Sequence, residues 1–241
     1  AMVGGDENST IQVSYGYGLF TGGLGAHYGG EAAGCTVIPT SSGNTKRQIQ
    51  MMKDLGTDIL ACTPSYALLI ADTAIEMGYD PAVDFKISAG IFGAEPASES
   101  MREDIRKKLG IQYCDVYGLS EVMGPGVAME CAESHGLHVA EDHFYAEIVD
   151  PDTLKPLPDG EYGELVFTTL TRECCPLVRY RTRDVTRIIP EECACGRTHR
   201  KIDRIVGRTD DMLILRGVNV FPSQIEQVIV SFPEIAAQYQ I

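Results

Sequence analysis

The stretch Val116-Tyr117-Gly118-Leu119-Ser120-Glu121-Val122-Met123-Gly124-Pro125-Gly126 decides how the rest of this chain is interpreted. The apolar run at 111–116 predicts a buried strand that ends at Val116 and leads into a loop. In open α/β sheets, ligands bind outside the carboxyl ends of the strands. The loop offers an aromatic face, a bare backbone, a hydroxyl for phosphate-like oxygens and a carboxylate for a hard cation, at Tyr117, Gly118, Ser120 and Glu121. The alternative is an ordinary strand-to-loop turn with a solvated carboxylate.

Upstream of this stretch, short apolar strands alternate with amphipathic helices. We expect strands at 10–14, 35–39, 58–62 and 86–92, and helices at 44–55, 63–77 and 99–109. This alternation predicts an α/β fold with a mainly parallel sheet and flanking helices. The carboxyl ends of parallel strands share one edge, so the loop Gly93-Ala94-Glu95-Pro96 is expected on the same edge as Tyr117–Glu121. Two such loops at one edge favour a ligand site.

Glycines and aromatic residues are interleaved between Tyr15 and Gly30. Glycines at 18, 22, 25 and 29 are three or four residues apart and predict a helix with a bare face. That face could form the wall of a pocket for an apolar ligand, with Tyr15, Tyr17 and Phe20 near its mouth. It could equally pack tightly against the sheet, and the residues alone leave both readings open.

From residue 128 onward the pattern changes to short strands, expected at 144–149, 163–169, 177–183 and 185–189. Asp184 ends a period-two stretch, where it could bridge two ribose hydroxyls or pair with a neighbouring arginine. Thr209-Asp210-Asp211 is a candidate hinge before a strand, a turn and a helix that opens at Pro222. We therefore predict domains at 1–127, at 128–209 (a β-rich subdomain), and at 210–241, the start of a small α+β C-terminal domain.

Cysteine and histidine residues in two segments form a metal candidate. Zinc prefers thiolate and imidazole ligands, and a four-coordinate structural site is expected from three cysteines and one of two histidines. These are Cys131, Cys193, Cys195 and either His138 or His199. Free thiols in a turn are the alternative, and the neighbouring Cys174-Cys175 is interpreted as an incidental pair.

Composition limits the classes of partner and compartment. The formal net charge of −14 argues against nonspecific binding to nucleic acid or to a membrane surface. No apolar run approaches the roughly 18 residues that a membrane-spanning helix needs. Eight cysteines are too few for a disulfide scaffold in 241 residues, so a reducing cytoplasm is expected. The expected partners are small molecules, with a homodimer considered as the assembly.

Taken together, these motifs make the chain resemble the phenylacetate–coenzyme A ligases, aryl-acid members of the adenylate-forming acyl-CoA synthetase superfamily. The resemblance covers nearly the whole chain. It rests on the motifs at 15–23, 93–96, 117–126, 141–145, 180–184 and 207–226.

The resemblance implies a reaction in two steps. An aryl carboxylate such as phenylacetate attacks the α-phosphate of ATP to give an acyl-adenylate, and the thiol of coenzyme A then displaces AMP. The implied adenine site comprises Gly93, Ala94, Glu95 and Tyr117, and Pro96 and Gly118 are implied as further nucleotide-binding residues. The implied contacts of the α-phosphate, Mg²⁺ and the ribose are Ser120, Glu121, and Asp184 with Arg208, respectively. Asp210 is implied as the hinge, and the aryl pocket as Tyr15, Tyr17, Phe20 and Gly22.

The resemblance also implies two features that this chain does not contain. One is a Ser/Thr/Gly-rich phosphate loop upstream of Tyr15, and the other is an adenylation-promoting lysine late in a longer C-terminal domain. We therefore expect an internal piece of a larger ligase, with little or no turnover of its own. The alternatives are a ligase for another aryl or small acid, and a nucleotide-binding module without catalysis.

Overall fold

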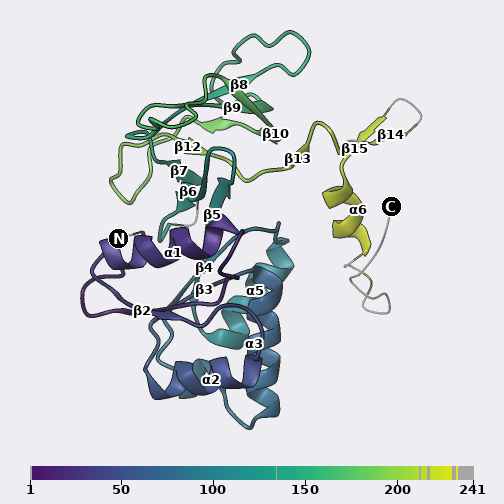
Figure 1. Ribbon diagram of the computed structural model, residues 1–241. Helices are drawn as coiled ribbons and strands as arrows, with labels where there is room; N and C mark the ends of the chain where they lie inside the picture. The colour runs from purple at the N-terminus through teal and green to yellow at the C-terminus, as the bar shows by residue number, and fades with distance from the viewer. Residues whose placement is uncertain (1, 134, 212, 216–217, 230–231, 233–241) are drawn as a thin grey trace. The chain divides into compact units, whose positions relative to one another are not determined.

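The computed structural model describes residues 2–133, 135–211, 213–215, 218–229 and 232. The chain divides into two compact units, Ala1–His138 with Cys193–Arg197, and Val139–Glu192 with Thr198–Ile241 (Figure 1). Among the described residues, no helix has the length and apolar character needed to cross a membrane. The predicted domains at 1–127, 128–209 and 210–241 stay a prediction.

The first unit is built on a mainly parallel sheet, as the sequence predicts. Its strands lie in the order β7-β6-β5-β4-β3-β1-β2. They are β1 (Thr10–Val13), β2 (Thr36–Pro39), β3 (Ile59–Cys62), β4 (Ala89–Phe92), β5 (Gln112–Leu119), β6 (Met123–Glu130) and β7 (Leu137–Val139). The helices are α1 (Thr21–Ala32), α2 (Thr45–Asp54), α3 (Pro64–Glu76), α4 (Pro81–Asp84) and α5 (Glu99–Leu109).

Both faces of this sheet are covered. Leu60 and Cys62 of β3 belong to a core that includes buried residues of α2, α3 and α5, and Figure 1 shows these helices grouped on one side. The alternate residues Ile59 and Ala61 pack in a second core with β1 and Ala26 of α1. All four residues of β3 are therefore buried, as expected for a strand covered on both faces.

The second unit consists mainly of antiparallel strands. β13 (Gly207–Arg208), β10 (Tyr180–Thr186), β9 (Gly163–Thr169) and β8 (Phe144–Val149) form one sheet in that order. β11 (Ile188–Ile189) pairs with β12 (Lys201–Ile202), and β14 (Leu213–Leu215) with β15 (Val218–Val220). The helix α6 (Pro222–Ile229) follows β15. The fold class predicted from the sequence is confirmed in both units.

Several predicted boundaries are wrong. β4 begins at Ala89 rather than at residue 86, and β2 begins at Thr36 rather than at residue 35 and is an edge strand with exposed positions. The strands expected at 177–183 and 185–189 are instead one strand, β10, and the two-residue β11. A shift of register between Arg181 and Val185, with a positive φ of 70° at Arg183, breaks the strict alternation on which that prediction relied.

Candidate functional site

The stretch around Ser120 is the tip of an antiparallel hairpin, not a loop that follows a strand ending at Val116. β5 continues to Leu119 and pairs with β6, with Tyr117 opposite Ala128 and Leu119 opposite Met123. A Cβ atom added at Gly118 would lie 2.9 Å from the carbonyl oxygen of Met123. The space beside Gly118 that was expected for a ligand is therefore occupied by the backbone of β6. The Ser120 hydroxyl lies 3.1 Å from the Thr21 hydroxyl, and the Glu121 side chain is exposed at the tip.

The Gly93–Pro96 turn lies on the predicted edge of the sheet, because β3, β4 and β5 are parallel neighbours. Ala94 has a φ of 73°, a left-handed conformation that is uncommon for a residue with a Cβ atom. The Glu95 carboxylate accepts a hydrogen bond of 2.6 Å from the backbone N–H of Ser65. Ser65 lies in the first turn of α3, where helix backbone N–H groups lack partners within the helix. Glu95 thus ties the turn to the start of α3.

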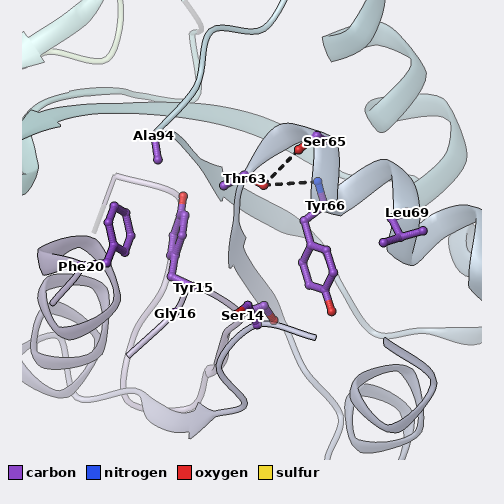
Figure 2. Close-up of a pocket in the computed structure, with 10 residues that line it drawn as sticks. Ser14, Tyr15, Gly16, Phe20, Thr63, Ser65, Tyr66, Leu69 and Ala94 are labelled. Atoms are coloured by element: carbon purple, nitrogen blue, oxygen red, sulfur yellow. Dashed lines mark hydrogen bonds between the residues drawn. The ribbon is translucent and has the colours of Figure 1, made fainter. Parts of the chain in front are cut away.

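A cavity of about 520 Å³ opens beside this turn (Figure 2). Its lining residues are Ser14, Tyr15, Gly16, Phe20, Ser42, Thr63, Ser65, Tyr66, Leu69 and Ala94. The rings of Tyr15 and Phe20 lie 5.8 Å apart between centroids, with Tyr15 4% exposed and Phe20 41% exposed. Burial raises the pKa of the Tyr15 phenol well above its usual value, so this wall carries no charge. The cavity suits a small ligand with an aromatic ring.

Two of the four residues predicted for the aryl pocket do not line this cavity. Tyr17 places its hydroxyl 3.1 Å from Nδ1 of His27, and Gly22 leaves room for the ring of Phe20. The glycine face of α1 serves packing at Gly25, where an added Cβ atom would lie 2.7 Å from the carbonyl oxygen of Gly124 in β6. Gly29 has open space beside it. Gly25 therefore packs tightly against β6, whereas Tyr15 and Phe20 line the cavity.

A buried ion pair links the β5–β6 hairpin to α5. Nη2 of Arg102 in α5 donates to both carboxylate oxygens of Glu130 in β6, at 2.6 and 2.7 Å. Nη1 of Arg102 donates to Asp115 in β5 at 3.2 Å, and the guanidinium lies 4.2 Å from the ring centroid of Tyr113. The Arg102 and Glu130 side chains are both 0% exposed. One arginine thus joins α5 to both strands of the hairpin, a role that the sequence analysis missed.

The metal candidate converges as predicted, with His138 as the histidine. The ligand atoms of Cys131, His138, Cys193 and Cys195 all lie within 4.8 Å of one another, and the first three residues are buried. His199 instead has its Nε2 atom 3.9 Å from a carboxylate oxygen of Asp142.

The thiols of Cys131 and Cys195 lie in contrasting environments. Burial raises the pKa of Cys131 to about 11. Burial also acts to raise the pKa of Cys195, but hydrogen bonds from Arg197 outweigh it and lower that pKa to about 7. Three thiols and one imidazole in this arrangement fit the donor set of a closed, tetrahedral zinc site.

The second unit brings three predicted residues together. Asp184 is buried and lies opposite Arg208 in the β10–β13 pair. Nη1 of Arg208 donates to Asp184 at 3.4 Å, whereas its Nε and Nη2 donate to the carboxylate of Asp210 at 3.0 and 2.9 Å. The guanidinium of Arg208 lowers the pKa of Asp210. Arg208 therefore contacts both Asp184, the residue predicted to bind the ribose, and Asp210, the residue predicted to act as the hinge.

The far wall of the cavity was not predicted from the sequence; it is formed by Thr63 at the N-cap of α3, by Ser65, Tyr66 and Leu69 of α3, and by Ser42. A signal was present, because Thr63-Pro64-Ser65 directly follows β3 and therefore starts at the same sheet edge as Gly93. Thr63 caps the helix by accepting from the N–H of Tyr66 at 3.3 Å, which satisfies one of the backbone donors of the first turn.

Comparison with known proteins assigns the family. The model of the AMP-binding enzymes matches residues 13–170, and the model of the AMP-binding enzyme C-terminal domain matches residues 217–241. The chain belongs to the AMP-binding enzyme family. The cavity, the Gly93–Pro96 turn and the β5–β6 hairpin all lie within the first matched region.

Two relatives of similar sequence are named phenylacetate-coenzyme A ligases. The chain is 55% identical over 239 residues to a phenylacetate-coenzyme A ligase of Pseudomonas putida, and 49% identical over 242 residues to one of Thermus thermophilus. The match covers 99% and 100% of the chain, but 54% of each relative, so the chain spans about half of their length. A crystal structure of 2-hydroxyisobutyryl-CoA ligase with a bound adenylate superposes with a TM-score of 0.90 at 26% identity, covering 98% of this chain and 51% of that one.

Proposed function

We propose that this chain carries the acid-binding part of an ATP-dependent aryl acid–coenzyme A ligase, with phenylacetate as the acid. The observation that carries the proposal is the cavity of about 520 Å³, with aromatic residues Tyr15 and Phe20 on one wall and the Gly93–Pro96 turn at its edge. An aryl ring buried there gains the free energy of removing apolar surface from water. The relatives named phenylacetate-coenzyme A ligase support this choice of acid.

In the proposed reaction, a carboxylate oxygen of the acid attacks the α-phosphorus of ATP, and pyrophosphate leaves. The thiol sulfur of coenzyme A then attacks the acyl carbon of the adenylate, a thioester forms, and AMP leaves. Holding the ring in the cavity orients the carboxylate, which lowers the entropic part of the barrier to the first step. The proposed domains at 1–127, 128–209 and 210–241 belong to the same hypothesis.

The hairpin and the turn would bind the nucleotide. We assign the Ser120 hydroxyl to the α-phosphate and the Tyr117 ring to the adenine, together with the backbone of Gly93 and Ala94. Glu121 fits a hard cation, because its carboxylate is exposed at the hairpin tip. Mg²⁺ bound there would neutralise negative charge on the phosphates.

Within the second unit we assign the ribose hydroxyls to Asp184, with Arg208 holding its carboxylate in place. Asp210 would act as the hinge, and its ion pair with Arg208 would fix one setting of that hinge. The Cys131-His138-Cys193-Cys195 cluster would hold a structural zinc ion. Its four protein ligands would leave no open position for a substrate.

Binding of a non-hydrolysable phenylacetyl-adenylate analogue, measured by calorimetry on this chain, tests the acid pocket. Phe20→Ala should weaken binding about 10- to 100-fold, since burial of a phenylalanine ring contributes roughly 1.5–3 kcal/mol. Tyr28→Ala is the matched control, because Tyr28 is an aromatic residue of α1 that is 62% exposed and does not line the cavity. Equal affinity for the parent chain and Phe20→Ala would contradict the assignment.

Turnover tests the ligase proposal. In a protein extended to the length of the phenylacetate–CoA ligase relatives, Glu121→Gln should lose most pyrophosphate release and still bind adenosine nucleotide. A module that only binds nucleotide would release no pyrophosphate in either form. Faster pyrophosphate release with benzoate or a short-chain acid than with phenylacetate would assign another acid to the same scaffold.

A further inference from the structure

The adjacent cysteines Cys174 and Cys175 lie in the connection between β9 and β10, and both are exposed free thiols. Their Sγ atoms are 4.0 Å apart. We propose that this pair is a chelating dithiol site for a thiophilic metalloid, namely trivalent arsenic in its oxyacid or aryl form. The proposal is independent of the ligase chemistry and of the four-residue cluster formed by Cys131, His138, Cys193 and Cys195.

The backbone makes these neighbours convergent. In an extended chain, adjacent side chains point to opposite faces, which would separate the two sulfurs. Cys175 has a φ of 51°, a left-handed conformation, and its sulfur lies on the same side as that of Cys174. The connection is held at its base, where Thr169 donates to Leu177 O at 2.9 Å. Nε of Arg172 also donates to the Cys174 carbonyl oxygen at 3.1 Å.

A direct disulfide is a poor product for this pair. Adjacent Cα atoms are about 3.8 Å apart across a trans peptide bond, which is shorter than the roughly 4.4–6.8 Å found in most disulfides. Such a bond is strained and easily reduced. A bridging atom avoids this strain, since two bonds of about 2.3 Å, the length of a zinc–thiolate bond, can span up to about 4.6 Å. One atom can therefore reach both sulfurs at their observed separation.

The number of ligands selects the element. Structural zinc takes four protein ligands, and the cluster of Cys131, His138, Cys193 and Cys195 supplies them. Around Cys174 and Cys175, the described part of the chain forms no group of three or more His, Cys, Asp and Glu ligands. Two thiolates and one oxygen or carbon substituent complete the coordination of trivalent arsenic, so two cysteines suffice.

The proposed step involves no oxidation or reduction. In arsenous acid or a hydrated arylarsine oxide, two As–OH bonds break and two As–S bonds form, while each thiol proton leaves with a hydroxide as water. Arsenic stays trivalent throughout. After the first As–S bond has formed, the second closes within the same chain, so its effective concentration far exceeds that of a free thiol. A monothiol competitor should therefore displace the ligand poorly, and a dithiol competitor should displace it well.

Phenylarsine oxide is the probe, added at one equivalent to the chain after zinc has been supplied to the four-residue cluster. Intact mass should show one phenylarsenic group per chain that survives excess glutathione and is removed by dithiothreitol. After digestion with trypsin, which cleaves after Arg172 and Arg179, the group should be found on peptide 173–179.

Cys174→Ser and Cys175→Ser should each abolish the glutathione-resistant adduct, and both are exposed positions where serine is tolerated. Cys35→Ser, at a partly exposed single cysteine, is the control and should retain it. The proposal is overturned if the adduct survives in either single variant, if it maps to Cys131, Cys193 or Cys195, or if glutathione removes it from the parent chain.

Discussion

Replacing Arg102 with alanine tests whether the buried ion pair stabilises the packing of the β5–β6 hairpin against α5. The substitution leaves the Glu130 carboxylate in a site where its side chain is 0% exposed and where two hydrogen bonds of 2.6 and 2.7 Å have been lost. Removing one partner of a buried pair costs about 3–5 kcal/mol, because the other charge stays desolvated. That is a large part of the roughly 5–15 kcal/mol by which a typical domain is stable.

Urea unfolding followed by circular dichroism measures this loss. Arg106→Ala is the matched control, because Arg106 lies one turn further along α5 and forms its ion pairs with Glu99 and Glu103 at the surface. That variant should lose only about 0–1 kcal/mol. The double variant Arg102→Met with Glu130→Gln removes both charges and should recover most of the loss.

Either of two results would refute the reasoning. The first is an Arg102→Ala variant whose free energy of unfolding falls by less than about 1 kcal/mol, the range expected for a surface ion pair. The second is a double variant that is no more stable than Arg102→Ala, since the cost would then not come from an unpaired charge. If Arg102→Ala does not fold, the double variant and the control still decide the question.

Glu95→Ala removes the carboxylate that accepts from the first turn of α3 and should lower stability by about 0.5–2 kcal/mol, with weaker binding of the acyl-adenylate analogue. Glu95→Gln keeps an acceptor and should retain most of both, so equal melting temperatures of the two variants would count against this contact. Gly25→Ala crowds the β6 backbone and should lower the free energy of unfolding by about 1–3 kcal/mol, whereas Gly29→Ala on the same helix has open space and should raise it by about 0.5–1 kcal/mol. Urea unfolding checks both glycine variants, and a shift in the same direction would show that the packing is misassigned. His138→Ala should reduce zinc, measured by atomic emission, well below one ion per chain, and His199→Ala should leave the zinc content unchanged. The reverse order would make His199 the ligand.

Local chemistry explains most of what the sequence predicts correctly. The Ser98 hydroxyl accepts from the N–H of Met101, and α5 runs from Glu99 to Leu109, the range expected from its apolar spacing. Thr63 and Pro64 open α3 in the same way. These signals lie within a few residues of the element that they define, so the sequence carries them without reference to the rest of the fold.

The hairpin and the cavity depend on partners far away in the chain. Gly124 and Pro125 resemble loop residues by composition, but they lie in β6 because that strand pairs with β5. The far wall of the cavity comes from the start of α3, and the sequence indicates only the sheet edge at which Thr63 lies, not that Thr63 and Tyr66 line a cavity. Spacing alone also could not choose between His138 and His199, since that choice depends on which imidazole lies near the three thiols.

The four-residue cluster has a consequence for chain connectivity. The chain leaves the first unit after His138 and returns to it at Cys193, and Cys131 is 62 residues from Cys193 in sequence with the two sulfurs 3.6 Å apart. An ion bound there would cross-link the two ends of this segment and close it into a loop. The chain-entropy relation for a cross-link of that span gives about 4 kcal/mol of stabilisation, drawn from the unfolded state. A peptide bond cut within residues 139–192 would then leave two fragments held together by the ion, and a chelator would release them.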